Sequence, residues 1–160
     1  MNDKSYRKNV GLIVLNKKNQ LLICKRKDKS AWQFPQGGID AGESDINALF
    51  RELFEEVGIN KNQVDIISKS NHWYYYDIPM GYKHRPKSLK NFKGQKQKWY
   101  LLKAKSDIKI NLSNQQPQEF IDYKWASYWF ALTKVVEFKK EVYRNVLTEF
   151  LPKYIQIYND

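Results

Sequence analysis

The sequence has little of what secreted scaffolds and several enzyme classes require. Cys24 is the only cysteine among 160 residues, so no internal disulfide can form and a disulfide-stabilised secreted fold is not supported. We expect Cys24 to be a packed thiol rather than a nucleophile, because three apolar residues precede it. The cytoplasm is therefore the default compartment.

Histidine is scarce as well. His72 and His84 are the only two, and neither stands in an HExxH pattern or near a Gly-x-Ser-x-Gly turn, so zinc hydrolysis and a serine triad lack support. The sequence also lacks a GxxxxGK[ST] phosphate loop and a dinucleotide fingerprint. The apolar run at residues 10–15 is too short for a membrane span or a signal-peptide core, and we expect a strand there and no membrane partner.

Acidic residues are concentrated in one short segment. Residues 37–59, GGIDAGESDINALFRELFEEVGI, contain six acids and one base, in a chain whose net charge is +11. Like charges resist ionising together, so we expect a cation among these carboxylates. An all-oxygen site suits a hard divalent ion such as Mg²⁺.

The spacing within this segment predicts an amphipathic helix over residues 45–57. Its apolar stripe consists of Ile46, Leu49, Phe50, Leu53 and Val57. Ser44 or Asp45 can cap the start, and Gly58 suits the left-handed residue that ends a helix.

Three glutamates of this helix fall on one face. Glu52, Glu55 and Glu56 are three and four positions apart, away from the apolar stripe. Three glutamates alone more often form a solvated surface. Here they follow a Gly-Gly pair, an additional Glu43 and an internal Arg51 at fixed offsets. This combination favours a functional site over a solvated surface.

The segment resembles the Nudix box, G-x5-E-x7-R-E-U-x-E-E-x-G-U with U aliphatic, at every defined position from residue 37 to residue 59. The resemblance implies a hydrolase of nucleoside diphosphates linked to another moiety, with two or more Mg²⁺ or Mn²⁺ ions as cofactors. It also implies that Glu52, Glu55 and Glu56 are catalytic metal ligands, and that Arg51 and Glu43 brace the loop and the helix.

Two further groups are expected at the ion site. Gly37, with Gly38, lets the backbone approach the ion or substrate, because glycine has no Cβ. Glu119 precedes a predicted strand and would by itself more often be an exposed loop acid, but the resemblance makes it an added metal ligand or base. The general base stays open between Glu56 and Glu119.

The pattern of the remaining chain predicts an α/β fold. Strands are predicted at 9–15, 20–26, 64–69, 72–77, 97–104 and 120–126, short extended pieces around 32–34, and helices at 45–57 and 135–151, with a helical C-terminal stretch broken near Pro152. The absence of a βαβ repeat predicts a mixed sheet between helical layers. The resemblance implies the Nudix α/β/α sandwich, and one domain over residues 1–160 is the simplest organisation.

A basic segment indicates a polyanionic partner. Residues 78–106 contain nine Lys or Arg and no Asp or Glu. A solvated basic loop explains this charge equally well, but interleaved aromatic residues modestly favour RNA.

Phrases outside the box narrow the resemblance. The ranges 6–11, 32–38, 94–100, 127–129 and 135–139 are similar to bacterial Nudix enzymes that remove pyrophosphate from the 5′ triphosphate end of RNA, which leaves a monophosphate and promotes mRNA decay. Dinucleoside polyphosphate hydrolases share the phrase WQFPQGG, so diadenosine tetra- or pentaphosphate is the alternative substrate. A non-catalytic RNA- or nucleotide-binding module is the alternative of another class, and the three clustered carboxylates argue against it.

This wider resemblance also implies substrate contacts. Arg26 and Phe138 would grip a base, and Gln95 and Lys139 would contact base edges or phosphates. The residues alone support plainer interpretations, in which Arg26 is a surface strand residue and Phe138 belongs to the core. Arg7 is a candidate phosphate contact, although a flexible basic N-terminus explains it equally well.

Overall fold

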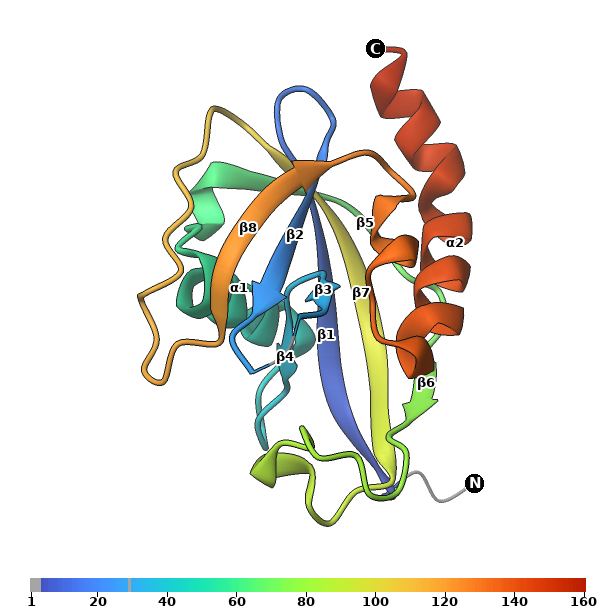
Figure 1. Ribbon diagram of the computed structural model, residues 1–160. Coiled ribbons are helices and arrows are strands. Elements are labelled where there is room, and N and C mark those ends of the chain that lie inside the picture. Colours follow the sequence, from blue (N-terminus) through green and yellow to red (C-terminus); the bar gives the residue numbers. More distant parts are fainter. Residues whose placement is uncertain (1–3, 29) are drawn as a thin grey trace.

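A computed structural model describes residues 4–28 and 30–160 of the protein (Figure 1). The strands are β1 (Tyr6–Leu15), β2 (Leu21–Arg26), β3 (Trp32–Gln33), β4 (Gln36–Gly38), β5 (Val64–Lys69), β6 (Tyr74–Asp77), β7 (Gly94–Ala104) and β8 (Phe120–Ala126). The helices are α1 (Asp45–Val57) and α2 (Lys140–Tyr158), with short 3-10 turns η1 (Lys61–Gln63), η2 (Lys87–Leu89), η3 (Phe130–Thr133) and η4 (Glu137–Lys139).

The strands form one mixed sheet. β1 and β7 are parallel over ten residue pairs, whereas every other strand pair is antiparallel. The order is β3-β2-β1-β7-β5, with β4 also on β1, β6 on β7 and β8 on β2. The recorded β1–β2 pairing is at the hairpin, Leu15 with Leu21, after which β1 pairs with β4 and β2 with β8.

Alternation along the central strands produces two hydrophobic cores. In β1, Leu12 and Val14 belong to the core under α1, whereas Ile13 and Leu15 belong to the core under α2. This division follows from the opposite directions of successive side chains in a strand. The helices therefore lie on opposite faces of the sheet (Figure 1), and the predicted α/β/α sandwich with a mixed sheet is confirmed.

Two predictions about the C-terminal helix are wrong. The C-terminal helix starts at Lys140 rather than at residue 135, because η3 and η4 occupy much of the intervening chain. Pro152 lies inside α2 and does not break it. Proline removes one hydrogen-bond donor from a helix, but Tyr154 still packs on Tyr128 at 4.2 Å between ring centroids, which holds the distal part in place.

Two predictions about exposed residues also change. Ile46 is 39% exposed and lies outside the apolar stripe of α1. Ala48, which was not predicted to belong to the stripe, is buried. Arg7 lies within β1 and not in a flexible terminus, since β1 begins three residues before the predicted strand. None of the helices among the described residues has the length and apolar character that crossing a membrane requires.

Candidate active site

Local sequence fixes both ends of α1. Ser44 accepts a hydrogen bond from the backbone N–H of Asn47 at 3.1 Å, which caps the start. Gly58 has φ of 74°, a left-handed conformation that favours glycine, and its N–H donates to the Phe54 carbonyl at 2.9 Å. The helix therefore presents its glutamates at a defined position.

Arg51 ties α1 to the loop before it. Its Nε donates to Glu43 at 2.8 Å, its Nη1 donates to Glu52 at 2.8 Å, and its Nη2 donates to the Gly38 carbonyl at 2.9 Å. Glu43 also accepts the backbone N–H of Asp40 at 3.0 Å. The hydrogen bonds from Arg51 lower the pKa of Glu43 to about 2, so this carboxylate stays ionised.

The two glycines of the loop are in close contact with charged side chains. A Cβ on Gly37 would lie 1.9 Å from the carboxyl carbon of Glu52, and one on Gly38 would lie 2.2 Å from the Arg7 guanidinium. Any side chain at either position would displace the neighbouring charged group. The Gly-Gly pair thus brings the backbone of β4 directly against Glu52 and Arg7.

A cavity of about 240 Å³ brings three of the predicted carboxylates together. Glu52 and Glu56 of α1 and Glu119 before β8 all line it. Glu55 does not line it, and its carboxylate accepts a hydrogen bond from Arg51 at 3.3 Å. Predicted substrate residues Arg7, Arg26 and Gln95 line the same cavity.

Burial makes the two inner glutamates hard to ionise together. It raises the pKa of Glu56 well above its ordinary value, and the charges of Glu52 and Glu119 add to this effect. Burial also raises the pKa of Glu52, although Arg51 opposes it. In the absence of a cation the two carboxylates therefore resist being ionised at the same time.

The donor set fits a divalent cation. Oε2 of Glu56 is buried and has no hydrogen-bond partner, which is costly unless something positive lies against it. Across residues 4–28 and 30–160, no three histidine, cysteine or acidic side chains already surround one point as a complete metal site. The carboxylates of Glu52, Glu56 and Glu119 nevertheless share one cavity, and hard cations prefer such oxygens.

Arg26 connects the carboxylates to the neighbouring space. Its guanidinium pairs with both oxygens of Asp28 at 3.0 and 3.1 Å, and Nη1 lies 3.5 Å from Glu119. Burial alone would lower the pKa of Arg26, but Asp28 and Glu119 raise it above its ordinary value. Arg26 is therefore a permanent positive charge beside the cavity.

A second hollow of about 50 Å³ adjoins the first and is more aromatic. Arg26 and Gln95 line both spaces. The ring of Phe138 lies 5.8 Å from that of Tyr76 and 5.1 Å from that of Tyr82, measured between centroids. Phe138 also packs against the core under α2. The ring is therefore partly a core residue and partly a wall of the hollow.

The polar wall between the two spaces was not predicted as a network. Gln95 donates to the Tyr76 hydroxyl at 2.6 Å and accepts from Asn9 at 2.9 Å. Buried Lys139 lies 3.4 Å from the side-chain oxygens of both Gln33 and Gln36. The sequence of β7 contained a signal for this wall. Gln95 and Gln97 occupy alternate positions, so they lie on the same face of the strand as the inward-facing Trp99.

Cys24 is buried under α1, as predicted for a packed thiol, and burial raises its pKa well above the ordinary value. His84 lines the aromatic hollow, but His72 lies on an exposed turn. Neither cysteine nor histidine lines the carboxylate cavity. The chemistry of that cavity therefore depends on carboxylates and guanidinium groups.

Comparison with known proteins agrees with this geometry. A family model described as NUDIX domain matches residues 5–147. An RNA pyrophosphohydrolase of Francisella tularensis subsp. mediasiatica (strain FSC147) is 45% identical over 152 residues, which cover 94% of this chain and 97% of the relative. An RNA pyrophosphohydrolase of Aliivibrio fischeri (strain MJ11) is 43% identical over 149 residues, which cover 91% and 85%.

Solved structures share the fold. A binary complex of a C. elegans Ap4A hydrolase is similar with a TM-score of 0.66 and 23% identity, over 92% of this chain and 98% of the other. An E. coli dihydroneopterin triphosphate pyrophosphohydrolase is similar with a TM-score of 0.70 and 20% identity, over 91% and 99%. At these identities the likeness concerns the fold.

Proposed function

This chain belongs to the Nudix family, and we propose that it is a hydrolase that removes pyrophosphate from the 5′ triphosphate end of RNA, leaving a 5′ monophosphate that promotes decay of the transcript. One observation carries the choice of substrate. The carboxylate cavity and the aromatic hollow share a wall that includes Arg26 and Gln95, so a polyphosphate and a base can be held side by side.

The carboxylate side would serve the phosphates. Nudix hydrolases generally use divalent metals, and we propose Mg²⁺ or Mn²⁺, two or more ions, held by Glu52, Glu56 and Glu119 with the carbonyl of Gly37 nearby. When bound, these ions neutralise phosphate charge and lower the pKa of water. Glu56 and Glu119 remain the two candidates to accept a proton from the attacking water. Glu55 stays a predicted ligand, although its carboxylate lies outside the cavity.

The aromatic side would select a nucleotide. The Arg26 guanidinium and the Phe138 ring face the hollow from two elements, and each offers a flat surface to a base. We infer that Lys139 and Gln95 donate to base edges or phosphates, and Arg7 to a phosphate. In support, Gln95 lines both spaces, Lys139 the hollow and Arg7 the cavity. Each of these assignments is a proposal about one residue.

The deciding experiment compares two substrates at equal Mg²⁺ concentration. Pyrophosphate release from triphosphorylated RNA is measured against cleavage of diadenosine tetra- and pentaphosphate, with Glu56→Gln as the inactive control. We expect a higher kcat/KM for RNA. A higher value for the dinucleotides would make them the substrate, and activity that survives in Glu56→Gln would reject the carboxylate site.

A further inference from the structure

One face of the sheet carries lysines and aromatic rings together, away from the glutamine-lined wall of the cavity. The parallel register places Lys8 of β1 beside Lys96 of β7, and Tyr75 of β6 pairs with Lys96 from the other side. Residues paired in register share a face. The amines of Lys96 and Lys98 both lie over the Trp73 ring, at 5.2 and 5.3 Å from its centroid.

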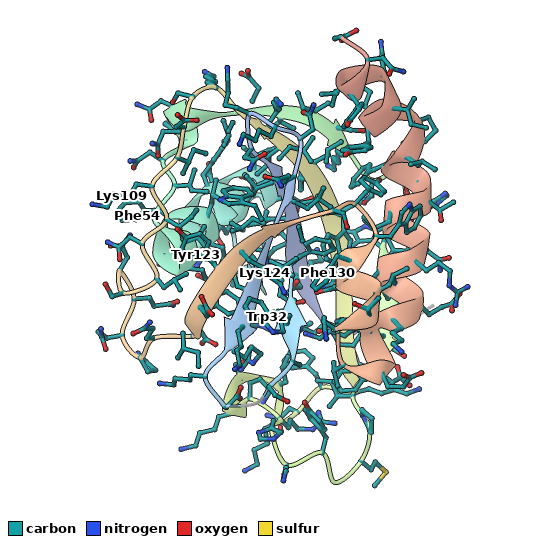
Figure 2. The ribbon with its side chains drawn as sticks, turned by 45° about the horizontal axis from the view of Figure 1, so that its top comes forward. Trp32, Phe54, Lys109, Tyr123, Lys124 and Phe130 are labelled. Carbon is teal, nitrogen blue, oxygen red and sulfur yellow. The ribbon has the colours of Figure 1, made fainter. Side chains whose placement is uncertain are left out.

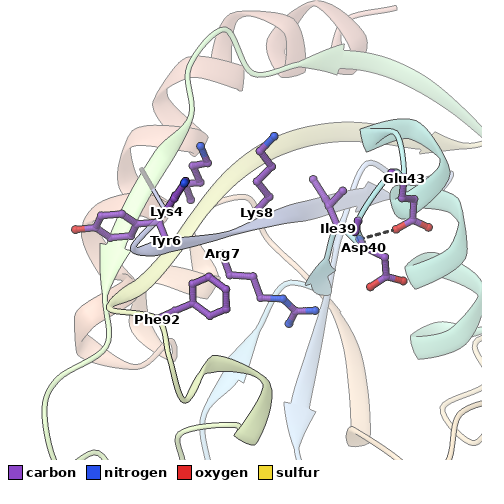
Figure 3. Close-up of a pocket in the computed structure, with 11 residues that line it drawn as sticks. Lys4, Tyr6, Arg7, Lys8, Ile39, Asp40, Glu43 and Phe92 are labelled. Carbon is purple, nitrogen blue, oxygen red and sulfur yellow. Dashed lines mark hydrogen bonds between the residues drawn. The ribbon is translucent and has the colours of Figure 1, made fainter. Parts of the chain in front are cut away.

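A hollow of about 800 Å³ passes over the edge of β1 next to this face (Figure 3). Lys4, Lys8 and Lys96 line it together with Arg7 and Phe92. Figure 3 shows Lys8 on one side of β1 and Arg7 on the other. Arg7 also lines the carboxylate cavity, so one side chain belongs to the walls of both spaces.

The charge of this hollow is positive in spite of two acids on its rim. Asp40 and Glu43 line it, but both face Arg51, whose guanidinium lies 3.5 Å from Asp40 and 2.8 Å from Glu43. Four basic side chains line the same space. A polyanion on this surface would therefore meet lysines and arginine, while the acids are engaged with the catalytic helix.

We propose that the RNA downstream of the 5′ end leaves the carboxylate cavity past Arg7, crosses the edge of β1 and lies along Lys8, Lys98 and Trp73. This inference rests on the proposed function and adds a path for the rest of the substrate. A basic track interleaved with flat rings is the arrangement that binds single strands without reading their sequence. An acidic protein surface would satisfy the lysines but would leave the stacking rings without a role.

The test varies RNA length with the 5′ end held constant. A triphosphorylated trinucleotide is compared with an RNA of about 16 nucleotides, the upper end of common single-strand site sizes. The variant is Lys8→Glu/Lys98→Glu, and the matched control is Lys109→Glu/Lys153→Glu, which changes two exposed lysines that line none of the three cavities.

We expect the wild type to have a lower KM for the longer RNA. The Lys8→Glu/Lys98→Glu variant should raise that KM about tenfold near 0.15 M salt and reduce the salt slope of binding by about 1.4, the values for two lost phosphate contacts. Its turnover of the trinucleotide should match that of the control variant. If the Lys8→Glu/Lys98→Glu variant does not fold, Lys8→Ala/Lys98→Ala is used in its place. This neutral variant should also raise the KM for the longer RNA.

The outcomes separate the two proposals. A wild-type enzyme that releases no pyrophosphate from either RNA would overturn the proposed function itself. An enzyme that hydrolyses both RNAs with equal KM, or a lysine variant that behaves like its control, would overturn the path alone. Equal losses on the trinucleotide and the long RNA would also reject it, because the lysines would then serve the catalytic cavity.

Discussion

The two helices meet the catalytic region in different ways. α1 has a side-chain cap at Ser44 and a left-handed glycine at its end, and Arg51 ties it to the loop before it. It presents carboxylates to the cavity. α2 starts without a side-chain cap directly after η4, and this junction presents the Phe138 ring and the Lys139 amine. Figure 2 draws the side chains of both helices and of the sheet between them.

Under the proposed function, this difference would separate chemistry from recognition. The carboxylates of α1 are placed by local spacing, so we expect that they can be changed without loss of the fold. The groups at the start of α2 are placed by packing against Tyr76 and Tyr82, so binding and stability are coupled there. Substitutions on the two sides should therefore give different kinetic signatures.

The largest effect is expected at the inner glutamates. Glu56→Gln should lower kcat by about 10²–10⁴-fold, because it removes a cavity carboxylate that binds a cation or accepts a proton. Its melting temperature should stay near that of the wild type, since an amide occupies the same space. Glu55→Gln is expected to lose activity as well, with the exposed Glu141→Gln as control, and full activity of Glu55→Gln would remove Glu55 from the ligand set.

A smaller loss of activity is expected for Arg51, which ties α1 to the loop before it. Lys in place of Arg51 keeps one charge but cannot reach Glu43, Glu52 and the Gly38 carbonyl together. Arg51→Lys should lower kcat by about 10–100-fold, the usual cost of a lost supporting contact at a metal site. It should also raise the Mg²⁺ concentration needed for half-maximal activity. Unchanged activation by Mg²⁺ would show that Arg51 does not position the carboxylates.

On the α2 side, the effect should fall on binding. Phe138→Leu keeps an apolar side chain in the core but removes the ring, and it should raise KM for RNA about 5- to 150-fold, the equivalent of 1–3 kcal/mol of stacking. Phe138→Tyr, which keeps the ring, is the matched control. A change in kcat with constant KM would contradict the assignment of Phe138 to recognition.

The smallest effect concerns stability at low pH. The pKa of Glu43 is lowered to about 2, so its bond to Arg51 stabilises the fold above the unfolded value of 4.5 and this contribution fades as the pH falls toward 2. Glu43→Gln lacks it. The difference in melting temperature between wild type and Glu43→Gln should therefore be largest near neutral pH and shrink between about pH 4.5 and pH 2, as measured by thermal unfolding.

Much of the fold follows from periodicity in the sequence. The bounds of α1, β5 and β8 agree with the predicted ranges 45–57, 64–69 and 120–126, because their apolar spacing, caps and flanking turns agree with one another. β1 and β7 extend three residues farther at their starts than predicted. Those residues, 6–8 and 94–96, are not apolar core residues. They form strand because β1 and β7 pair with each other there.

From the residues alone, only the charged side of the site could be predicted. The residues of the aromatic hollow, Arg26, Gln95, Phe138 and Lys139, were expected only from the resemblance. Glutamates four apart and a Gly-Gly pair are local signals. The network of Asn9, Gln36, Gln95 and Gln97, in contrast, joins strands far apart in sequence. Spacing put Glu55 on the same helix face as Glu52 and Glu56, so it could not show that only Glu52 and Glu56 line the cavity. The division of the chain into one domain and the individual site roles remain predictions.

The long sequence separations within the cavity bear on how the protein is made. Asn9 bonds to Gln95 across 86 positions, and Lys139 contacts Gln33 across 106. Non-local contacts form late, after the entropy of closing long loops has been overcome. A nascent chain that has emerged from the ribosome only through α1 therefore contains Glu52 and Glu56 but neither Glu119 nor Phe138. The site can be complete only after the last third of the chain has been made.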